Sequence, residues 1–259
     1  MARPGRALTV RLLLADGYEV SATGIDGQPV VLTVPAGAPP AFECDPEPPV
    51  DPALVDGLRI PEAFGPSALR ATQTNPTNLG DNVNELNTLY VAGGDGALRV
   101  GIPGNLQQDG HAFALFIDSV PGGQAEVNTV GSGPPPSGLS DLTGTRFDAG
   151  FAPDRLFYVN TFGGSIFVDG LELSAGEAGL KRFVGQGSVG SGEGALVGGD
   201  NPEGVEIAMD NSNTAGVGDG ALGDPASATR GFEMRIPYTA LGLPADACGG
   251  VAVFAAIVR

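Results

Sequence analysis

Two short stretches decide the fold: Leu98-Arg99-Val100-Gly101-Ile102 and Phe232-Glu233-Met234-Arg235-Ile236. In each stretch apolar residues alternate with polar or small ones. This alternation is typical of a strand in a sheet that has one face on the core and the other in water. Similar runs, separated by clusters of glycine, proline, asparagine and aspartate, predict strands at 85–92, 97–102, 112–118, 155–161, 165–168, 204–209, 231–236 and 250–258.

Helical periodicity is scarce outside these runs. One helical turn is predicted at 238–242, where Gly242 would close it. Many short strands with turn residues between them and hardly any helix predict an all-β fold. We expect an antiparallel two-sheet β-sandwich of the jelly-roll kind with very little helix.

The pattern divides the chain into three parts. Residues 1–34 contain β-like runs too few to form a core, so they predict a partial β module or edge strands added to the main one. Residues 35–53 are rich in proline and acidic residues and predict a linker. The sandwich is predicted at 54–259. Because the last apolar run, 251–258, has no closing turn after it, we expect the sandwich to be truncated at its C-terminus.

The composition excludes several classes of partner and site. The chain has 13 basic and 30 acidic residues and a net charge of −17, which excludes the basic footprint of a nucleic-acid-binding protein. No apolar run reaches the ~18–20 residues of a membrane-spanning helix. One histidine and two cysteines exclude multi-histidine metal sites and zinc ribbons. Cys44 and Cys248 could form a disulfide or stay free thiols, and both alternatives are open.

Motifs for catalysis are weak. The glycine-rich stretch 185–190 has the spelling of a dinucleotide-binding loop, but no helical pattern follows it, which favours a flexible glycine and serine loop. His111 has no identifiable partners of a catalytic triad, so we expect a turn or surface position. A pair of carboxylates acting as in a glycosidase stays an alternative, since thirty acidic residues allow many pairings. We expect a protein without catalytic activity.

Aspartate and asparagine residues gather where predicted strands end. Calcium binds six to eight oxygen atoms, which such side chains and turn carbonyls supply. A structural calcium site is therefore one hypothesis, and the alternative is that these residues simply form turns. The candidate ligands are Asp118, Asp148, Asp154, Asp210, Asn211 and Asn213.

Several segments between residues 54 and 258 follow one another in a recognisable order. They are Val55-Asp56-Gly57-Leu58, Ala63-Phe64-Gly65, Thr72-Gln73-Thr74, Gly80-Asp81-Asn82, Asn84-Glu85-Leu86, and the stretches 101–106, 116–124, 147–154 and 208–217. Together they resemble secreted bacterial β-sandwich domains of the DOMON and family 9 carbohydrate-binding-module group. The resemblance implies a jelly-roll-like sandwich, an extracellular or cell-envelope location, and a structural calcium, sugar or haem site.

The same resemblance implies a non-catalytic binding module within a larger secreted protein, with polysaccharide or another cell-surface component as its partner. Sugar-binding members of the group hold sugar rings against aromatic side chains, commonly tryptophan. This chain has no tryptophan, so Tyr90 and Tyr158 are the candidate ligand-binding residues. A structural or adhesive surface domain, stabilised by calcium and without a small-molecule ligand, is the alternative. A glycoside hydrolase with two carboxylates is a third hypothesis.

Overall fold

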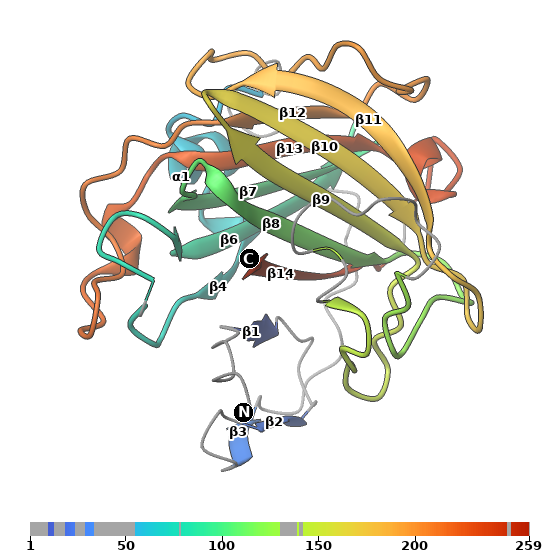
Figure 1. Ribbon diagram of the computed structural model, residues 1–259, viewed down its shortest axis with the longest axis horizontal. Helices are drawn as coiled ribbons and strands as arrows, with labels where there is room; N and C mark the ends of the chain where they lie inside the picture. Colours follow the sequence, from blue (N-terminus) through green and yellow to red (C-terminus); the bar gives the residue numbers. More distant parts are fainter. Residues whose placement is uncertain are drawn as a thin grey trace, which may run out of the picture.

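Two antiparallel sheets pack face to face in the computed structural model (Figure 1). The structure describes residues 55–77, 79–129, 139, 142–247 and 250–258, together with the backbone of 10–12, 19–23 and 29–33. The predicted all-β two-sheet sandwich is therefore confirmed.

The first sheet has six strands in the order β1-β14-β8-β9-β10-β11. Their bounds are β1 Val10–Leu12, β14 Ala252–Val258, β8 Asp109–Asp118, β9 Arg155–Phe162, β10 Ser165–Glu172 and β11 Leu180–Ser188. In the second sheet the order is β12-β13-β7-β6-β4, and β5 pairs with the end of β7. Its bounds are β12 Glu206–Met209, β13 Gly231–Pro237, β7 Ala97–Asn105, β6 Thr88–Gly94, β4 Leu69–Thr72 and β5 Glu85–Leu86.

Helices are few and short in the described part of the chain. The α-helix α1 spans Ile60–Phe64, and short 3-10 helices span Pro66–Ala68, Pro225–Ser227 and Tyr238–Leu241. The last one ends at Gly242, whose left-handed φ of 73° confirms the predicted glycine-closed turn. No helix among the described residues has the length and apolar character needed to span a membrane.

The N-terminal region contributes three short strands. The backbone of β1 pairs with β14 at the edge of the first sheet, whereas β2 (Glu19–Thr23) and β3 (Pro29–Thr33) form a separate two-stranded sheet. The predicted linker at 35–53 lies outside the described residues. The division of the chain into three parts stays a prediction.

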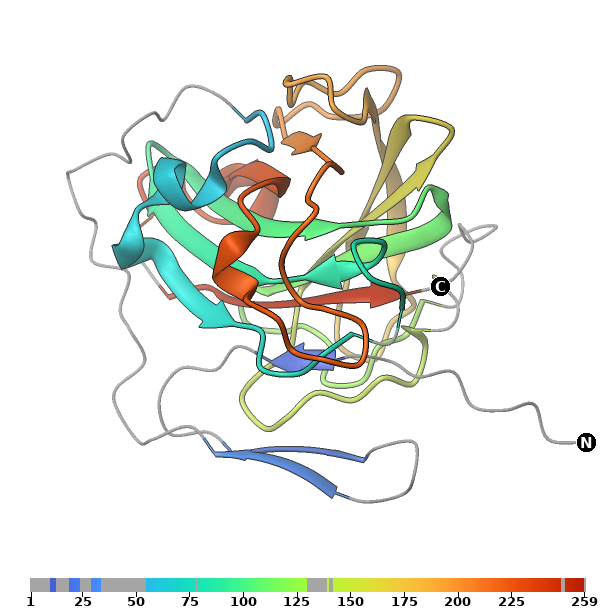
Figure 2. The same cartoon turned by 90° about the vertical axis from the view of Figure 1, so that its left-hand side faces the viewer.

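The alternating pattern places one face of each central strand in the core between the sheets. Leu98, Val100 and Ile102 of β7 are at most 2% exposed and belong to this core. The opposite face was expected to be in water, but it is covered. A Cβ atom at Gly101 would lie 2.5 Å from Ile60 of α1, so only glycine allows the helix to pack this closely on β7. Figure 2 shows α1 against the second sheet.

Polar residues on this outer face are buried by the same covering segment. Glu233 of β13 is 2% exposed, and its Oε2 accepts hydrogen bonds from the backbone nitrogens of Asp56 and Gly57, each at 3.1 Å. Burial raises the pKa of Glu233, while these two hydrogen bonds and the charge of Arg99 lower it and the charge of Asp56 raises it. The expectation of one wet face was wrong for these central strands.

A second apolar cluster lies on the outer face of the first sheet. Phe116 of β8 and Phe254 of β14 pack there with Phe147 and Phe151, which come from the connection between β8 and β9. The ring centroids of Phe116 and Phe147 are 5.0 Å apart in an edge-to-face contact. This connection therefore covers the part of the outer face that carries large apolar side chains.

Strand β11 was not predicted, and its presence corrects the interpretation of 185–190 as a flexible glycine and serine loop. The stretch 185–188 belongs to β11 and is not a flexible loop. Gly185 has a φ of 152°, and a Cβ atom there would lie 3.0 Å from Leu196 Cβ and 3.1 Å from the carbonyl oxygen of Val197 in the segment that follows β11. The glycine in this stretch therefore reflects close packing of a neighbouring segment at the edge of the sheet.

Candidate functional site

The two predicted ligand-binding tyrosines are buried. Tyr90 of β6 is 7% exposed, and its ring centroid lies 5.9 Å from that of Phe64 beneath α1. Tyr158 of β9 has no exposed surface and belongs to the outer apolar cluster of the first sheet. Stacking of a sugar requires an accessible ring face, so this arrangement does not support the predicted role of either tyrosine.

The six candidate calcium ligands fall into two groups at opposite ends of β8. Asn211 lies beside Leu106, just before β8 begins, whereas Asp118 is the last residue of that strand. A strand of ten residues spans about 30 Å, so one ion cannot bind both groups. Asp154 lies near Asp118 because β9 pairs with β8, and Asp148 comes from the connection between these two strands.

Asp118 and Asp154 accept hydrogen bonds from the backbone of the connection between β8 and β9. Asp154 Oδ1 accepts hydrogen bonds from the backbone nitrogens of Ser119 at 2.6 Å and Val120 at 3.0 Å. Its Oδ2 lies 3.2 Å from Nη1 of Arg155. Asp118 Oδ2 accepts a hydrogen bond from the nitrogen of Ala152 at 2.9 Å. Burial raises the pKa of Asp118, the Ala152 hydrogen bond lowers it, and the charge of Asp154 raises it further.

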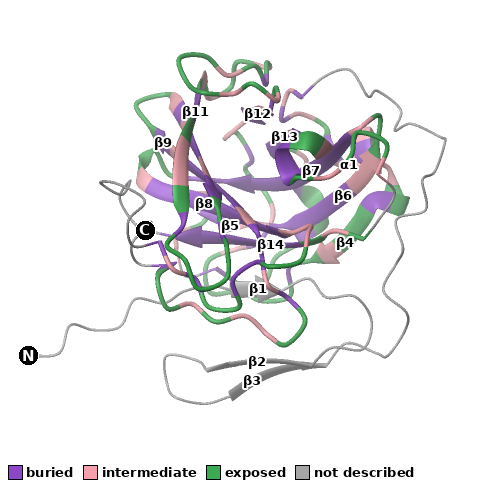
Figure 3. Cartoon of the chain, turned by 90° about the vertical axis from the view of Figure 1, so that its right-hand side faces the viewer, coloured by how far each residue is buried: buried purple, intermediate pink, exposed green. Residues whose placement is uncertain are grey.

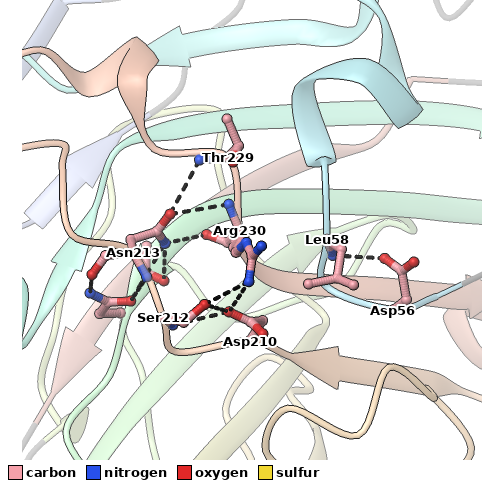
Figure 4. A network of polar contacts seen from close by, with 9 residues as sticks. Asp56, Leu58, Asp210, Ser212, Asn213, Thr229 and Arg230 are labelled. Atoms are coloured by element: carbon pink, nitrogen blue, oxygen red, sulfur yellow. Dashed lines mark hydrogen bonds and ion pairs between the residues drawn. The ribbon is translucent and has the colours of Figure 1, made fainter.

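The second group ties the segment after β12 to neighbouring strands (Figure 4). Asn213 Oδ1 accepts hydrogen bonds from the nitrogens of Thr229 and Arg230, both at 3.2 Å, and its Nδ2 donates to Gly104 O at 3.0 Å. Asn211 accepts a hydrogen bond from Leu106 N at 2.7 Å and donates one to Leu106 O at 2.6 Å. These amides use both their donors and their acceptors, which supports the turn-forming alternative.

Asp210 has a similar local role. Its Oδ1 accepts a hydrogen bond from Ser212 N at 3.0 Å and lies 3.8 Å from Nη1 of Arg230. In the described part of the chain, no three or more histidine, cysteine, aspartate or glutamate side chains are grouped so that they could hold a metal ion. Calcium binding at the six predicted residues stays a hypothesis without geometric support.

His111 was expected at a turn or on the surface, but it is only 5% exposed. Its Nδ1 lies 2.5 Å from Oδ1 of Asp109 at the start of β8. The surface position was wrong because the strand begins two residues before the histidine and carries it inward. Cys44 and Cys248 lie outside the described residues.

An aromatic surface that the sequence analysis missed lies on the outer face of β9, β10 and β11. The register aligns Asn160, Phe167 and Gln186 across the three strands, and two positions further along it aligns Tyr158, Asp169 and Phe183. Residues two apart in a strand share a face, so Phe162 lies on this side as well. We call Phe162, Phe167, Phe183, Asn160 and Gln186 the outer aromatic face.

The three phenylalanines of this face form a diagonal. Diagonal neighbours on adjacent strands are about 7–8 Å apart, so one ring lies on each strand at nearly regular intervals. Phe162 is 67% exposed and Phe183 is 38% exposed, while Phe167 is half-buried. Figure 3 shows the intermediate and exposed residues along β9 and β11.

Polar groups accompany the rings. Asn160 Oδ1 is buried and accepts no hydrogen bond from the described residues. Asp169 is 7% exposed, and its Oδ1 lies 3.8 Å from Nζ of Lys181. Burial raises the pKa of Asp169, and the charge of Lys181 lowers it. The strand predicted at 155–161 ends one residue before Phe162, and extending its period-two pattern from Asn160 to Phe162 is the signal that could have identified these two residues of the face.

A second feature is a polar cluster at the end of the sandwich where β7 ends. Asn84 Oδ1 accepts a hydrogen bond from Gln107 N at 2.9 Å, and Asn87 Oδ1 accepts one from Val217 N at 2.7 Å. Asn105 Nδ2 donates to Asn213 O at 3.0 Å. Segments that are far apart in the sequence, and on which the resemblance rests, therefore meet at this end.

Comparisons with known proteins found no relative. No protein-family model matches the sequence, and neither a curated protein nor a solved structure matches it.

Proposed function

We propose that this chain is a non-catalytic module that binds neutral polysaccharide through its outer aromatic face. We further propose that it acts outside the cell or in the cell envelope, as part of a larger secreted protein. The observation that carries the proposal is the diagonal of phenylalanines, of which Phe162 and Phe183 are exposed, with the exposed amide of Gln186 beside it. Binding sites for small organic groups typically combine aromatic surface with a few polar groups that fix orientation.

The distribution of exposed apolar side chains supports this face over the rest of the described surface. Among the described residues, the exposed large apolar side chains on this face are Phe162, Phe183 and Val197, which forms a β-bridge with Gln186, whereas Leu180 lies on the other side of β11 and Leu69 and Leu222 lie elsewhere. Contiguous exposed apolar surface marks interaction sites.

The polar groups favour a hydroxyl-rich ligand. The exposed side chain of Gln186, aligned with Phe167, offers a donor and an acceptor to sugar hydroxyls. The net charge of −17 repels anionic polymers, so neutral polysaccharide is the favoured class.

A non-catalytic role is supported by the environment of one acidic pair, Asp118 and Asp154. A glycosidase needs one carboxyl group free to protonate the leaving oxygen and a second free to act as nucleophile or base. Asp154 instead accepts hydrogen bonds from Ser119 N, Ser119 Oγ and Val120 N, and Asp118 accepts one from Ala152 N.

Affinity electrophoresis and calorimetry with a panel of neutral polysaccharides test the proposal. We expect Phe162→Ala and Phe183→Ala each to weaken binding about tenfold, equal to about 1.4 kcal/mol. Leu222→Ala is the matched control, because Leu222 is exposed but lies outside the outer aromatic face. Absence of binding to every neutral polysaccharide, or equal loss in the control, contradicts the proposal.

A structural or adhesive surface domain is the second candidate. It is favoured by the use of Asn211 and Asn213 as hydrogen-bonding links between segments. Sedimentation and small-angle scattering separate the two, because an adhesive domain self-associates or changes its dimensions with calcium in the absence of sugar.

A further inference from the structure

A small, partly open pocket lies between the two sheets beside β5. It has a volume of about 40 Å³ and is lined by residues of both sheets and of the segment after β12: Gln73, Thr77, Leu79, Asn84, Glu85, Leu86, Val217, Ala255 and Ile257. A water molecule needs about 10–15 Å³ by this measure, so the pocket can contain an ion with one or two waters.

Glu85 is the lining residue that lacks a full set of partners. Its side chain belongs to a residue that is 2% exposed, and Oε1 accepts a hydrogen bond from Asn105 Nδ2 at 3.4 Å. Oε2 is buried and has no hydrogen-bond partner among the described residues. Buried carboxylates are ordinarily paired with a positive charge or bound to a metal, because an isolated buried charge is very costly.

No described residue supplies that positive charge at the pocket. Its described lining residues include no arginine, lysine or histidine. The nearby carboxylate of Asp81 adds a second negative charge, and together with burial it raises the pKa of Glu85 to about 7, while a hydrogen bond with Asn87 lowers it. Two acidic groups therefore share this end of the sandwich without a basic partner on the described pocket wall.

Five of the other lining residues are apolar, and the neutral side-chain oxygen atoms come from Gln73, Thr77 and Asn84. Thr77 Oγ1 donates a hydrogen bond to Asn84 O at 3.2 Å and accepts one from Leu79 N at 3.1 Å, which leaves a lone pair available. Carboxylate, hydroxyl and amide oxygens are the ligands that hard divalent cations prefer.

We propose that the pocket beside Glu85 binds one hard divalent cation, with the Glu85 carboxylate as the buried ligand and the Thr77 hydroxyl beside it. Asp81 is exposed and lies near Glu85 but not on the pocket wall, and its negative charge attracts the cation. None of the residues of this site belongs to the six candidate calcium ligands. The bound cation stabilises the end of the sandwich where Thr77 and the segment after β12 exchange hydrogen bonds, Thr77 N to Gly218 O and Gly220 N to Thr77 O, both at 3.1 Å.

The test uses the full chain, stripped of metal with EDTA and exchanged into EDTA-free buffer. Calcium, magnesium and, at matched ionic strength, sodium are then titrated while Tm is followed, and bound metal is counted by calorimetry. We expect one divalent ion per chain and a rise in Tm that sodium does not reproduce. Glu85→Gln should lower the metal affinity at least tenfold and abolish the rise in Tm. Glu172→Gln, which removes an exposed carboxylate of β10, should keep both the affinity and the rise in Tm.

Asp81→Asn is a second variant that keeps the test decisive if Glu85→Gln does not fold, because Asp81 is exposed. It should weaken metal affinity by about tenfold. Absence of bound divalent metal, or an equal response in Glu85→Gln, overturns the proposal. A Tm that rises as the pH falls through 7, with no response to metal, also overturns it, because Glu85 is then held in its protonated form.

Discussion

Phe113 of β8 stacks on Phe232 of β13, with ring centroids 4.5 Å apart and an interplanar angle of 21°. Both side chains are at most 1% exposed. Because β8 belongs to the first sheet and β13 to the second, the pair joins the two layers of the sandwich directly. Aromatic pairs of this kind bury large apolar areas and add about 0.5–1.5 kcal/mol beyond the area they bury.

Phe232→Ala is expected to lower the free energy of unfolding by about 3–5 kcal/mol, because the truncation leaves a cavity between the sheets. Urea denaturation followed by circular dichroism measures the change. Phe162→Ala is the matched control: Phe162 is 67% exposed, and its truncation should change stability by no more than about 0.5 kcal/mol. Equal effects of the two substitutions would show that Phe232 does not join the layers.

Asn213 is expected to be sensitive even to a near-isosteric change. In Asn213→Asp the carboxylate cannot donate to Gly104 O, and it places a negative charge beside that carbonyl oxygen. We expect a loss of about 2–3 kcal/mol in unfolding free energy, since a buried acceptor is left without its donor.

The same variant separates the two interpretations of this loop. Added negative charge strengthens a calcium site, so a calcium ligand at this position would give Asn213→Asp a larger calcium-dependent rise in Tm than the wild type. We expect no such rise. Ser212→Ala, which alters an exposed neighbour, is the control and should cost much less stability.

The strands could be predicted where their pattern is local. The alternation in β7 and β13 identified both strands, because period two follows directly from the pleat. Strand β11 escaped prediction because Gly185 and Gly187 interrupt its apolar pattern, and their reason lies in a neighbouring segment of the fold. Likewise, Asn87 separates β5 from β6 by bonding to distant partners, Pro103 and Val217.

The functional residues were harder to predict for the same reason. Whether a tyrosine on a strand is exposed depends on what covers that face, and Tyr90 is covered by α1 from an earlier part of the chain. The amides of Asn211 and Asn213 look like metal ligands in the sequence, yet their partners lie about a hundred residues away or across a loop. Composition and turn preference are local properties, so they could not predict these long-range hydrogen bonds.

Gly101→Ala is expected to displace α1 from β7. The new Cβ atom would lie 2.5 Å from Ile60 and 2.6 Å from Phe64, so the helix must move or the strand must shift. Such overpacking costs about 1–3 kcal/mol of unfolding free energy. Gly94→Ala in β6 is the matched control, because its Cβ would meet no atom within 4 Å. Thermal denaturation of the two variants measures the difference, and similar Tm values would contradict close packing of α1 on Gly101.

Glu233→Gln is expected to change how stability depends on pH. Burial raises the pKa of Glu233 above its ordinary value of 4.5, so the folded chain holds the proton more tightly than the unfolded chain does. The contribution of Glu233 is therefore most favourable below pH 4.5 and declines as the pH rises through the raised pKa. Glutamine carries no such charge, and its Oε1 can still accept from Asp56 N and Gly57 N.

The unfolding free energies of wild type and Glu233→Gln, measured by urea denaturation between pH 5 and pH 8, test this expectation. The variant should gain stability relative to the wild type as the pH increases. Glu193→Gln removes a charge from an exposed loop residue and controls for the change in net charge. If the unfolding free energies of the wild type and Glu233→Gln change in parallel over this range, the pKa of Glu233 is not raised in the folded chain. The carboxylate is then hydrated, which requires the covering segment at Asp56 and Gly57 to open to water.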